Sequence, residues 1–357
     1  MMASMRVPFG DLARQAAALG PELTDALLRV SRGGWYVLGA EVAAFEAEFA
    51  RFCGAETAVG VASGAEALYL ALAALDVGPG DEVITVANAC VYQAAAILQA
   101  GARPVFVDID PARHTLDPAL LEAAISPRTK VIMPVHLYGR AADMAAIWAI
   151  ARRYGLQVVE DAAQAHGARY DGPDGPAVGG GASALTCWSF YPSKNLGALG
   201  DGGALTTGSA ELAARLRRLR MYGWGAKYIA SEPGGRNSRL DELQAAALRV
   251  KLRHLATWNQ ARRERAAWYR ELCDQRDELR QHLLAAGIGC DVHYPLPAHL
   301  QPAYASLGYQ RGQLPHSERA AARLLSLPLF PELTRAEVEE VAQAVRGFFA
   351  SRGPGRP

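Results

Sequence analysis

One lysine in the sequence lies in a context that favours covalent chemistry with a carbonyl group. Lys194 belongs to the segment Ser-Phe-Tyr-Pro-Ser-Lys-Asn (189–195), and a glycine-rich stretch, 197–203, follows it. An amine must be neutral to form a Schiff base, and partial removal from water favours the neutral form. Aromatic side chains just before the lysine can exclude water, and the glycines let the backbone approach a flat ligand closely. The segment therefore makes Lys194 a candidate reactive lysine, although a lone lysine in a loop is more often an ordinary surface residue.

A carboxylate, Asp161, follows the apolar stretch 156–159 and is expected at the end of a buried strand. A carboxylate in such a poorly solvated place needs a cationic partner, and a protonated pyridine nitrogen is one. That pairing turns the ring into an electron sink, which is the chemistry of pyridoxal 5'-phosphate (PLP). Taken alone, Asp161 is better explained as the N-cap of the next helix, but its spacing to Lys194 fits the PLP pattern and favours the cofactor role.

A third feature is typical of phosphate binding. Ser63, Gly64 and Ala65 open a helix directly after the strand expected at 58–61. Free backbone N–H groups and the helix dipole favour an anion at such a place, and the hydroxyl of Ser189 can reach the same phosphate. Simple capping of the helix by Ser63 is the alternative.

Strands and helices alternate over the first two thirds of the chain, which predicts an α/β fold with a mostly parallel sheet. Expected strands are 58–61, 82–86, 104–108, 131–135 and 157–160, and expected helices reach from Ser63 to Leu75 and over 94–100, 117–125 and 141–154. Ligands of such folds bind at the carboxyl ends of the strands. This edge is predicted to gather Ser63–Gly64, His136, Asp161 and the segment after Ser189.

The pattern changes near residue 240 and predicts a division into two domains. Residues 1–245 are expected to form a large PLP-binding domain, and 246–357 a smaller α+β domain. The second part contains a long helical stretch (241–272), a segment interrupted by Gly and Pro (287–302) and a helix over 334–349.

The composition of the chain restricts which partners it is expected to bind and in which cellular compartment it is expected. The chain has 357 residues and a net charge of +1 without a dense Lys/Arg run, so neither nucleic acid nor an anionic membrane is expected as the main partner. Five cysteines without CxxC spacing argue against a zinc site or a disulfide framework and favour a reducing cytoplasm. We expect no membrane span, because no apolar run reaches about 18 residues, and no signal peptide, because residues 1–10 lack an apolar core.

These motifs occur together, in order, in one enzyme family. The sequence resembles the DegT/DnrJ/EryC1/StrS sugar aminotransferases, which belong to the fold type I (aspartate aminotransferase-like) PLP enzymes. The resemblance covers nearly the whole chain, and its blocks are highly specific in this combination. They are 33–39 (GGWYVLG), 79–84 (PGDEVI), 135–139 (VHLYG), 160–164 (EDAAQ), 189–195 (SFYPSKN), 200–203 (GDGG) and 237–246 (NSRLDELQAA).

The resemblance implies a catalytic role for two residues. Lys194 would carry PLP as a Schiff base and move the proton between the cofactor and the sugar carbon. Asp161 would pair with the pyridine nitrogen, and Gln164 would lie near the phenolic oxygen of the cofactor. His166 and Tyr191 would lie near the site, with less defined roles.

It also implies how the phosphate is held. The backbone at Gly64 and Ala65 would bind it together with the Ser189 hydroxyl. Asn237 would reach the same phosphate from the neighbouring subunit, so the active unit would be a homodimer with shared active sites.

The sequence departs from the family pattern at two places. The family usually has Thr where this chain has Ala65, so one side-chain contact with the phosphate would be missing. The family also stacks an aromatic ring on the cofactor, and alignment puts Cys90 in that place, with Tyr92 as a substitute if the local backbone path differs. Both changes are expected to alter cofactor affinity without removing the chemistry.

The reaction implied by the resemblance is ping-pong transamination. An amino donor, usually L-glutamate, would load the cofactor, and a keto sugar linked to a nucleotide would then accept the amine. Relatives with histidine in place of the lysine perform dehydration, so Lys194 favours transamination. The stretches 222–224 and 237–242 are similar to members that act on 3-keto sugars, which favours a dTDP-3-keto-6-deoxyhexose as substrate and a role in antibiotic-sugar or surface-glycan synthesis.

Aromatic and histidine residues are candidates for lining the sugar pocket, with core packing as the alternative: Trp35, Tyr36, Tyr191, His293 and Tyr294. Amination at C4, or of an aminocyclitol ketone, is a second possibility for the reaction. A non-catalytic PLP-binding regulator is a third, although the lysine and its acid partner are both retained. A dinucleotide-binding oxidoreductase is excluded, because residues 60–64 lack the third glycine of the G-x-G-x-x-G motif.

Overall fold

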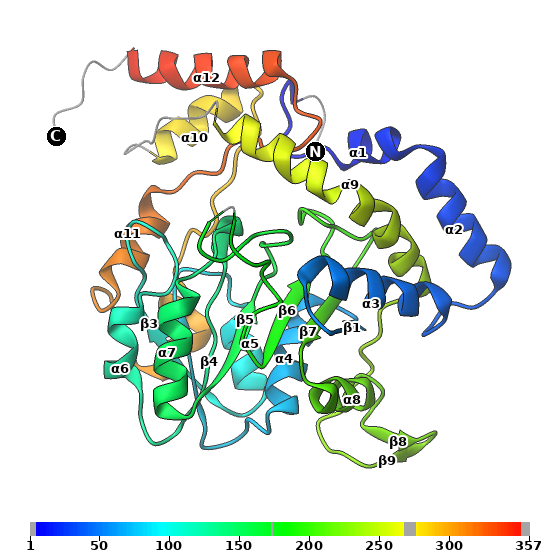
Figure 1. The fold of residues 1–357 in the computed structure, drawn as a ribbon. Helices are drawn as coiled ribbons and strands as arrows, with labels where there is room; N and C mark the ends of the chain where they lie inside the picture. The colour runs from blue at the N-terminus through cyan, green and yellow to red at the C-terminus, as the bar shows by residue number, and fades with distance from the viewer. Residues whose placement is uncertain (1–4, 173, 268–275, 351–357) are drawn as a thin grey trace.

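A seven-stranded sheet of short, mostly buried strands forms the centre of the molecule (Figure 1). The computed structural model describes residues 5–172, 174–267 and 276–350. Neighbouring strands follow the order β1-β7-β6-β5-β4-β2-β3. All pairs from β6 to β3 are parallel, whereas β7 is antiparallel to both β6 and β1. The strands are β1 (Thr57–Val61), β2 (Glu82–Val86), β3 (Arg103–Val107), β4 (Thr129–Ile132), β5 (Gln157–Asp161), β6 (Leu185–Ser189) and β7 (Gly203–Thr207). The predicted mostly parallel α/β fold is confirmed.

Helices cover both faces of this sheet. Successive strand residues face opposite layers, so Val83 and Ile84 belong to different apolar clusters. One face is covered by α4 (Gly64–Ala74), α5 (Tyr92–Gln99) and α8 (Ala210–Leu219). The other face is covered by α3 (Ala40–Cys53), α7 (Met144–Tyr154) and α9 (Glu242–Ala266), with the short α6 (Leu121–Ala124) beside them.

Several predicted elements have different bounds in the structure. The strand expected at 131–135 ends at Ile132, because Pro134 has no N–H to continue the ladder. The helix expected over 117–125 is a 3-10 turn (Pro118–Leu120) followed by α6, with the Asp117 side chain accepting the Ala119 N–H at 3.0 Å. The helix expected over 241–272 is α9, which ends at Ala266, and Leu272 lies outside the described residues.

The N-terminal and C-terminal parts of the chain pack together above the sheet in Figure 1. Helices α1 (Leu12–Leu19) and α2 (Pro21–Gly33) pack on α9, and Val7 lies in an apolar cluster with α10 (Arg276–Ala285) and α12 (Arg335–Ala350). Helix α11 (Pro315–Arg323) lies beside the β3 edge of the sheet. The predicted boundary at 245/246 falls inside the continuous helix α9, and the two-domain division remains our proposal.

A buried carboxylate joins the start of α9 to the start of α3. Glu242, which is 3% exposed, accepts the backbone N–H groups of Gly39 (2.8 Å), Glu41 (2.9 Å) and Val42 (2.9 Å). These N–H groups have no partner within their own helix, so the carboxylate supplies both hydrogen bonds and a charge that suits the helix dipole.

We therefore expect Glu242→Ala to lower the free energy of unfolding by about 1–3 kcal/mol, since three buried N–H groups lose their acceptor. Chemical denaturation followed by circular dichroism measures this difference. Glu339→Ala serves as the control, because Glu339 pairs only with Arg335 on the exposed side of α12. Equal stability of the two variants would contradict the assigned role of Glu242.

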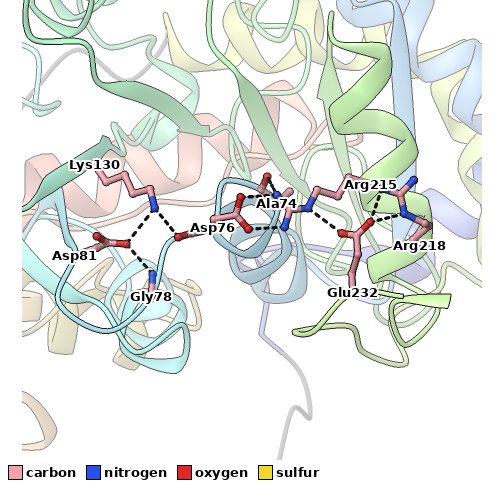
Figure 2. A network of polar contacts seen from close by, with 8 residues as sticks. All are labelled: Ala74, Asp76, Gly78, Asp81, Lys130, Arg215, Arg218 and Glu232. Atoms are coloured by element: carbon pink, nitrogen blue, oxygen red, sulfur yellow. Dashed lines mark hydrogen bonds and ion pairs between the residues drawn. The ribbon is translucent and has the colours of Figure 1, made fainter. Parts of the chain in front are cut away.

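A two-stranded hairpin, β8 (Trp224–Ala226) and β9 (Ile229–Ala230), projects from the main body at the lower edge of Figure 1. Figure 2 shows the charged network that holds the segment after it. Glu232 accepts hydrogen bonds from Arg215 (2.9 Å) and from Arg218, and Arg215 also reaches Asp76 after α4 (2.8 Å). Hydrogen bonding to Arg215 lowers the pKa of Asp76. The network thereby fixes the segment between Glu232 and Asn237 against α4 and α8.

No helix among the described residues combines the length and apolar character that crossing a membrane requires.

Candidate active site

Three strands end at the same edge of the sheet and bring the predicted residues together. β5 and β6 are parallel, and β1 runs in the same direction because both β1 and β6 are antiparallel to β7. Their carboxyl ends carry Asp161, Ser189 and Ser63. A pocket opens at this edge, lined by Ala89, Cys90, Tyr92, Gln93, Val135, Leu137, Asp161, Ala163, Gln164, Lys194 and Tyr294.

Lys194 contributes an amine to this pocket. Its side chain lines the pocket beside Asp161, and no described residue hydrogen-bonds to its Nζ. Burial lowers the pKa of Lys194, while Asp161 and Cys90 act in the opposite direction. A larger fraction of the amine is therefore neutral at a given pH than for a lysine in water, which is the form that attacks a carbonyl.

The loop that carries Lys194 is tightly folded. The Lys194 N–H donates to Tyr191 O (2.8 Å), and a Cβ at Gly197 would lie 2.2 Å from Pro192 O, so only glycine fits there. Lys251 on α9, which is 4% exposed, donates its Nζ to the carbonyl oxygen of Gly197 (2.8 Å). Burial lowers the pKa of Lys251 to about 8. These contacts hold the loop, and with it Lys194, against the body of the protein.

Asp161 supplies a buried carboxylate at the end of β5. It is 4% exposed, and its Oδ1 accepts the N–H of Ala163 at 2.9 Å. Its Oδ2 accepts a hydrogen bond from the side-chain amide of Gln93. Sequence reasoning missed Gln93, although a polar residue directly before the apolar run 94–98 of helix α5 was a usable signal.

The predicted phosphate loop has a close-packed geometry. Ser63 caps α4 through a hydrogen bond from the Glu66 N–H to its Oγ (3.2 Å), which leaves the N–H groups at the very start of the helix for a ligand. A Cβ at Gly64 would lie 2.5 Å from the Cβ of Ser189 and 2.9 Å from its Oγ. Only glycine therefore allows the Ser189 hydroxyl to lie beside the first residue of α4.

Gln164 joins two sides of the pocket. Its Oε1 accepts the Tyr138 N–H at 2.8 Å, and its Nε2 donates to the hydroxyl of Tyr294 at 3.2 Å. Burial is the largest cause of a raised pKa at Tyr294. Tyr138 donates its own hydroxyl to the carbonyl oxygen of His293 and is a further residue that sequence reasoning did not identify.

Cys90 and Tyr92 both line the pocket, at the place where the family pattern has an aromatic ring. The thiol of Cys90 is the largest cause of the raised pKa of Tyr92, followed by burial, so the two side chains are near each other. Which of them contacts a cofactor ring stays a prediction.

His166 lies behind the pocket wall. It is 1% exposed among Phe49, Trp188 and Phe190, and its Nδ1 lies 2.8 Å from the Oδ1 of Asn195. Burial lowers its pKa to about 3, so the ring is neutral at physiological pH. The Nδ2 of Asn195 returns a hydrogen bond to the carbonyl oxygen of His166 (2.8 Å), which fixes the residue directly after Lys194.

One predicted position is corrected by the structure. His136 follows β4 as expected, but its side chain is fully buried away from the pocket. Its Nε2 lies 2.6 Å from Glu160 Oε2, and its Nδ1 accepts the Ala142 N–H at 3.1 Å. Tyr170 donates to the same carboxylate oxygen at 2.8 Å. The sequence pattern located the end of the strand but not the direction of the side chain, which here pairs with a buried acid.

Other predicted residues lie outside this pocket in a single chain. Trp35 is 66% exposed and lines a separate cleft with Arg29 and Glu242, and Tyr36 lies next to it. Asn237 is exposed. Tyr191 is exposed three residues before Lys194, and His293 hydrogen-bonds to the Oγ of Ser326 through its Nδ1 (2.9 Å). Their proposed roles depend on a neighbouring subunit or on the substrate and remain predictions.

PLP fits the residues that are present. The pocket contains an amine with no hydrogen-bond partner among the described groups and a buried carboxylate that retains lone pairs for a cationic ring nitrogen. A helix start with a serine hydroxyl beside it lies at the same edge of the sheet. These are the groups that the aldehyde, the pyridine nitrogen and the phosphate of PLP require.

Comparisons with known proteins agree with this geometry. Residues 18–275 and 270–346 match the model of the DegT/DnrJ/EryC1/StrS aminotransferase family. The chain is 47% identical to the dTDP-3-amino-3,4,6-trideoxy-alpha-D-glucose transaminase of Streptomyces venezuelae, over 96% of each chain. It is 46% identical to the "pleiotropic regulatory protein" of Geobacillus stearothermophilus, over 97% of this chain and 99% of that one. The crystal structure of S. venezuelae DesV in complex with a ketimine intermediate superposes with a TM-score of 0.92 at 46% identity, covering 96% of this chain and 98% of that chain. The chain therefore belongs to the DegT/DnrJ/EryC1/StrS family of PLP-dependent aminotransferases.

Proposed function

We propose that this protein transfers an amino group from L-glutamate to a nucleotide-linked 3-keto-6-deoxyhexose, with dTDP as the favoured nucleotide. The proposal rests on one observation: the Lys194 amine and the Asp161 carboxylate line the same pocket. The predicted phosphate site, formed by Gly64 and Ser189, lies at the same edge of the sheet. The similarity to the S. venezuelae dTDP-sugar transaminase supports the choice of substrate class.

Each residue has a defined task in this reaction. When bound, PLP supplies an electron sink for the carbon that gains or loses the amino group. In the glutamate half-reaction the Lys194 Nζ would take the proton from that carbon and deliver it to the cofactor, and in the sugar half-reaction it would move a proton from the cofactor to the sugar carbon, a contribution of roughly 10²–10⁴-fold to the rate. Asp161 holds a proton on the ring nitrogen, and the N–H groups of Gly64 and Ala65 bind the phosphate together with the Ser189 hydroxyl.

The test is an absorbance spectrum of the protein with PLP, before and after L-glutamate, followed by assays with 3-keto and 4-keto nucleotide sugars and an aminocyclitol ketone. We expect a bound-cofactor band that glutamate bleaches, and amination of the 3-keto sugar. Amination of only the 4-keto sugar or the cyclitol ketone would overturn the substrate assignment. A protein that binds PLP without reacting with glutamate would instead favour a regulatory role, in line with the name of the G. stearothermophilus relative.

The active unit in this proposal is a homodimer in which Asn237 binds the phosphate in the neighbouring subunit. Asn237 is exposed, and the network in Figure 2 anchors the segment leading to it. Large apolar side chains are exposed on the same hairpin region and before α3, as expected for a surface that another copy covers: Trp35, Tyr36, Tyr228 and Ile229.

Subunit complementation tests this arrangement. Lys194→Ala and Asn237→Ala are each expected to be nearly inactive as homodimers. A mixed dimer keeps one complete site, built from the Lys194 of one subunit and the Asn237 of the other, so mixing the variants under subunit exchange should restore activity. Light scattering establishes the dimer, and a mixture as inactive as its components would contradict sharing of the sites.

A further inference from the structure

Gln93 forms a buried hydrogen bond with Asp161 that has no role in the reaction proposed above. It lies in the first turn of α5, is 4% exposed, and donates its side-chain amide to Asp161 Oδ2. The other oxygen of Asp161 accepts the Ala163 N–H at 2.9 Å. The carboxylate therefore has two donors, one on each oxygen, and one of them comes from a helix 68 positions earlier in the chain.

The orientation of the Gln93 amide follows from its surroundings. The Oε1 of Gln93 is buried and has no hydrogen-bond partner among the described residues. A carboxylate accepts hydrogen bonds and cannot donate them, so the NH₂ group must face Asp161. Leaving a buried acceptor unpaired is costly, which indicates that the contact with Asp161 determines where this side chain lies. The start of α5 adds the positive end of its helix dipole near the same carboxylate.

We propose that Gln93 is a positioning residue: its amide orients the Asp161 carboxylate toward the ring nitrogen of the bound cofactor and so helps Asp161 to hold the proton there. The proposal rests on the proposed function, because it needs PLP in this pocket with its ring nitrogen at Asp161. Its physical basis is that a hydrogen bond to a carboxylate is strongest where water is excluded, so the Gln93 amide fixes the direction in which the carboxylate presents its remaining lone pairs. A carboxylate held at the ring nitrogen in turn stabilises the protonated ring.

Replacing Gln93 with methionine tests the proposal, since methionine has a similar length and remains apolar but lacks the donor. Hydrogen bonds to charged groups are among the stronger ones in proteins, so losing this one should slow the half-reaction with L-glutamate by roughly tenfold or more. The direct readout is the ¹⁵N chemical shift of ring-labelled PLP bound to the protein, which reports whether the ring nitrogen is protonated. We expect a protonated nitrogen in the wild type and a partly or fully deprotonated one in Gln93→Met.

The control variants show whether a negative result contradicts the role of Gln93 or the proposed function. Gln99→Leu removes an exposed glutamine from the last turn of the same helix, where its amide faces Arg236 and not Asp161, and should retain the wild-type shift of the ring nitrogen. Gln93→Leu repeats the test if the methionine variant does not take up PLP. A ring nitrogen that stays protonated in either apolar variant overturns the role of Gln93 while the proposed function stands. A wild type that binds no PLP overturns both.

Discussion

Lys194→Ala is expected to abolish the absorbance band of protein-bound PLP in its Schiff-base form and to slow amino-group transfer by at least roughly 10²–10⁴-fold. The variant loses both the covalent attachment point and the group that moves the proton. Because no described residue pairs with Nζ, little stability should be lost. Spectra and single-turnover assays with L-glutamate measure the two effects, and a small added amine should restore part of the rate.

Lys130→Ala is the matched control. Lys130 is a partly exposed residue that pairs with Asp81 at 3.3 Å and donates to the carbonyl oxygen of Asp76. It lies at the end of the Figure 2 network remote from Glu232, so its removal should leave the segment before Asn237 in place and the spectrum and rate unchanged. The lowered pKa of Lys194 adds a pH test. Attack on PLP requires the neutral amine, so the apparent pKa of cofactor capture by the apoprotein should lie below that of a free lysine. A Lys194→Ala variant that transfers amino groups at the wild-type rate would refute its role.

Asp161→Ala is the second change with a large expected effect. It removes the charge that balances the protonated ring nitrogen, and the loss of one partner from a buried charge pair costs about 3–5 kcal/mol. The glutamate half-reaction should therefore slow by roughly 10²–10³-fold or more, since each 1.36 kcal/mol corresponds to a factor of ten. Stopped-flow absorbance measures the half-reaction.

Asp117→Asn serves as the control for the rate measured with Asp161→Ala. Asp117 caps a short turn far along the chain from the site, and asparagine can take over that hydrogen bond, so this control should behave as wild type. If Asp161→Ala still binds PLP and reacts with glutamate at an unchanged rate, the carboxylate is not the partner of the ring nitrogen.

The chemistry-bearing residues could be identified from sequence because each lies next to a local signal. Lys194, Asp161 and Ser189 follow or end short apolar strands, and parallel strands bring their carboxyl ends to one edge. Gly64 follows a strand and starts a helix, which local pattern alone predicts. The mostly parallel α/β fold and the family could therefore be expected from the sequence, whereas the strand order and the strands β6 and β7 could not.

The sequence could not determine which distant residues each buried polar side chain hydrogen-bonds to. His136 was expected near the ligand but pairs with Glu160, because the position of a strand end does not determine where the side chain points. Gln93 hydrogen-bonds to Asp161, which lies 68 positions later in the chain. Glu242 hydrogen-bonds to the start of α3, which lies about 200 positions earlier.

The sequence by itself determined the candidate reactive residues of this protein and the type of scaffold that carries them, because strand periodicity, helix starts and glycine positions are local properties of the chain. Only the tertiary structure decided which buried polar groups satisfy one another. Their hydrogen bonds join segments that are remote in sequence, so they form only when packing brings β5, α5, α3 and α9 together.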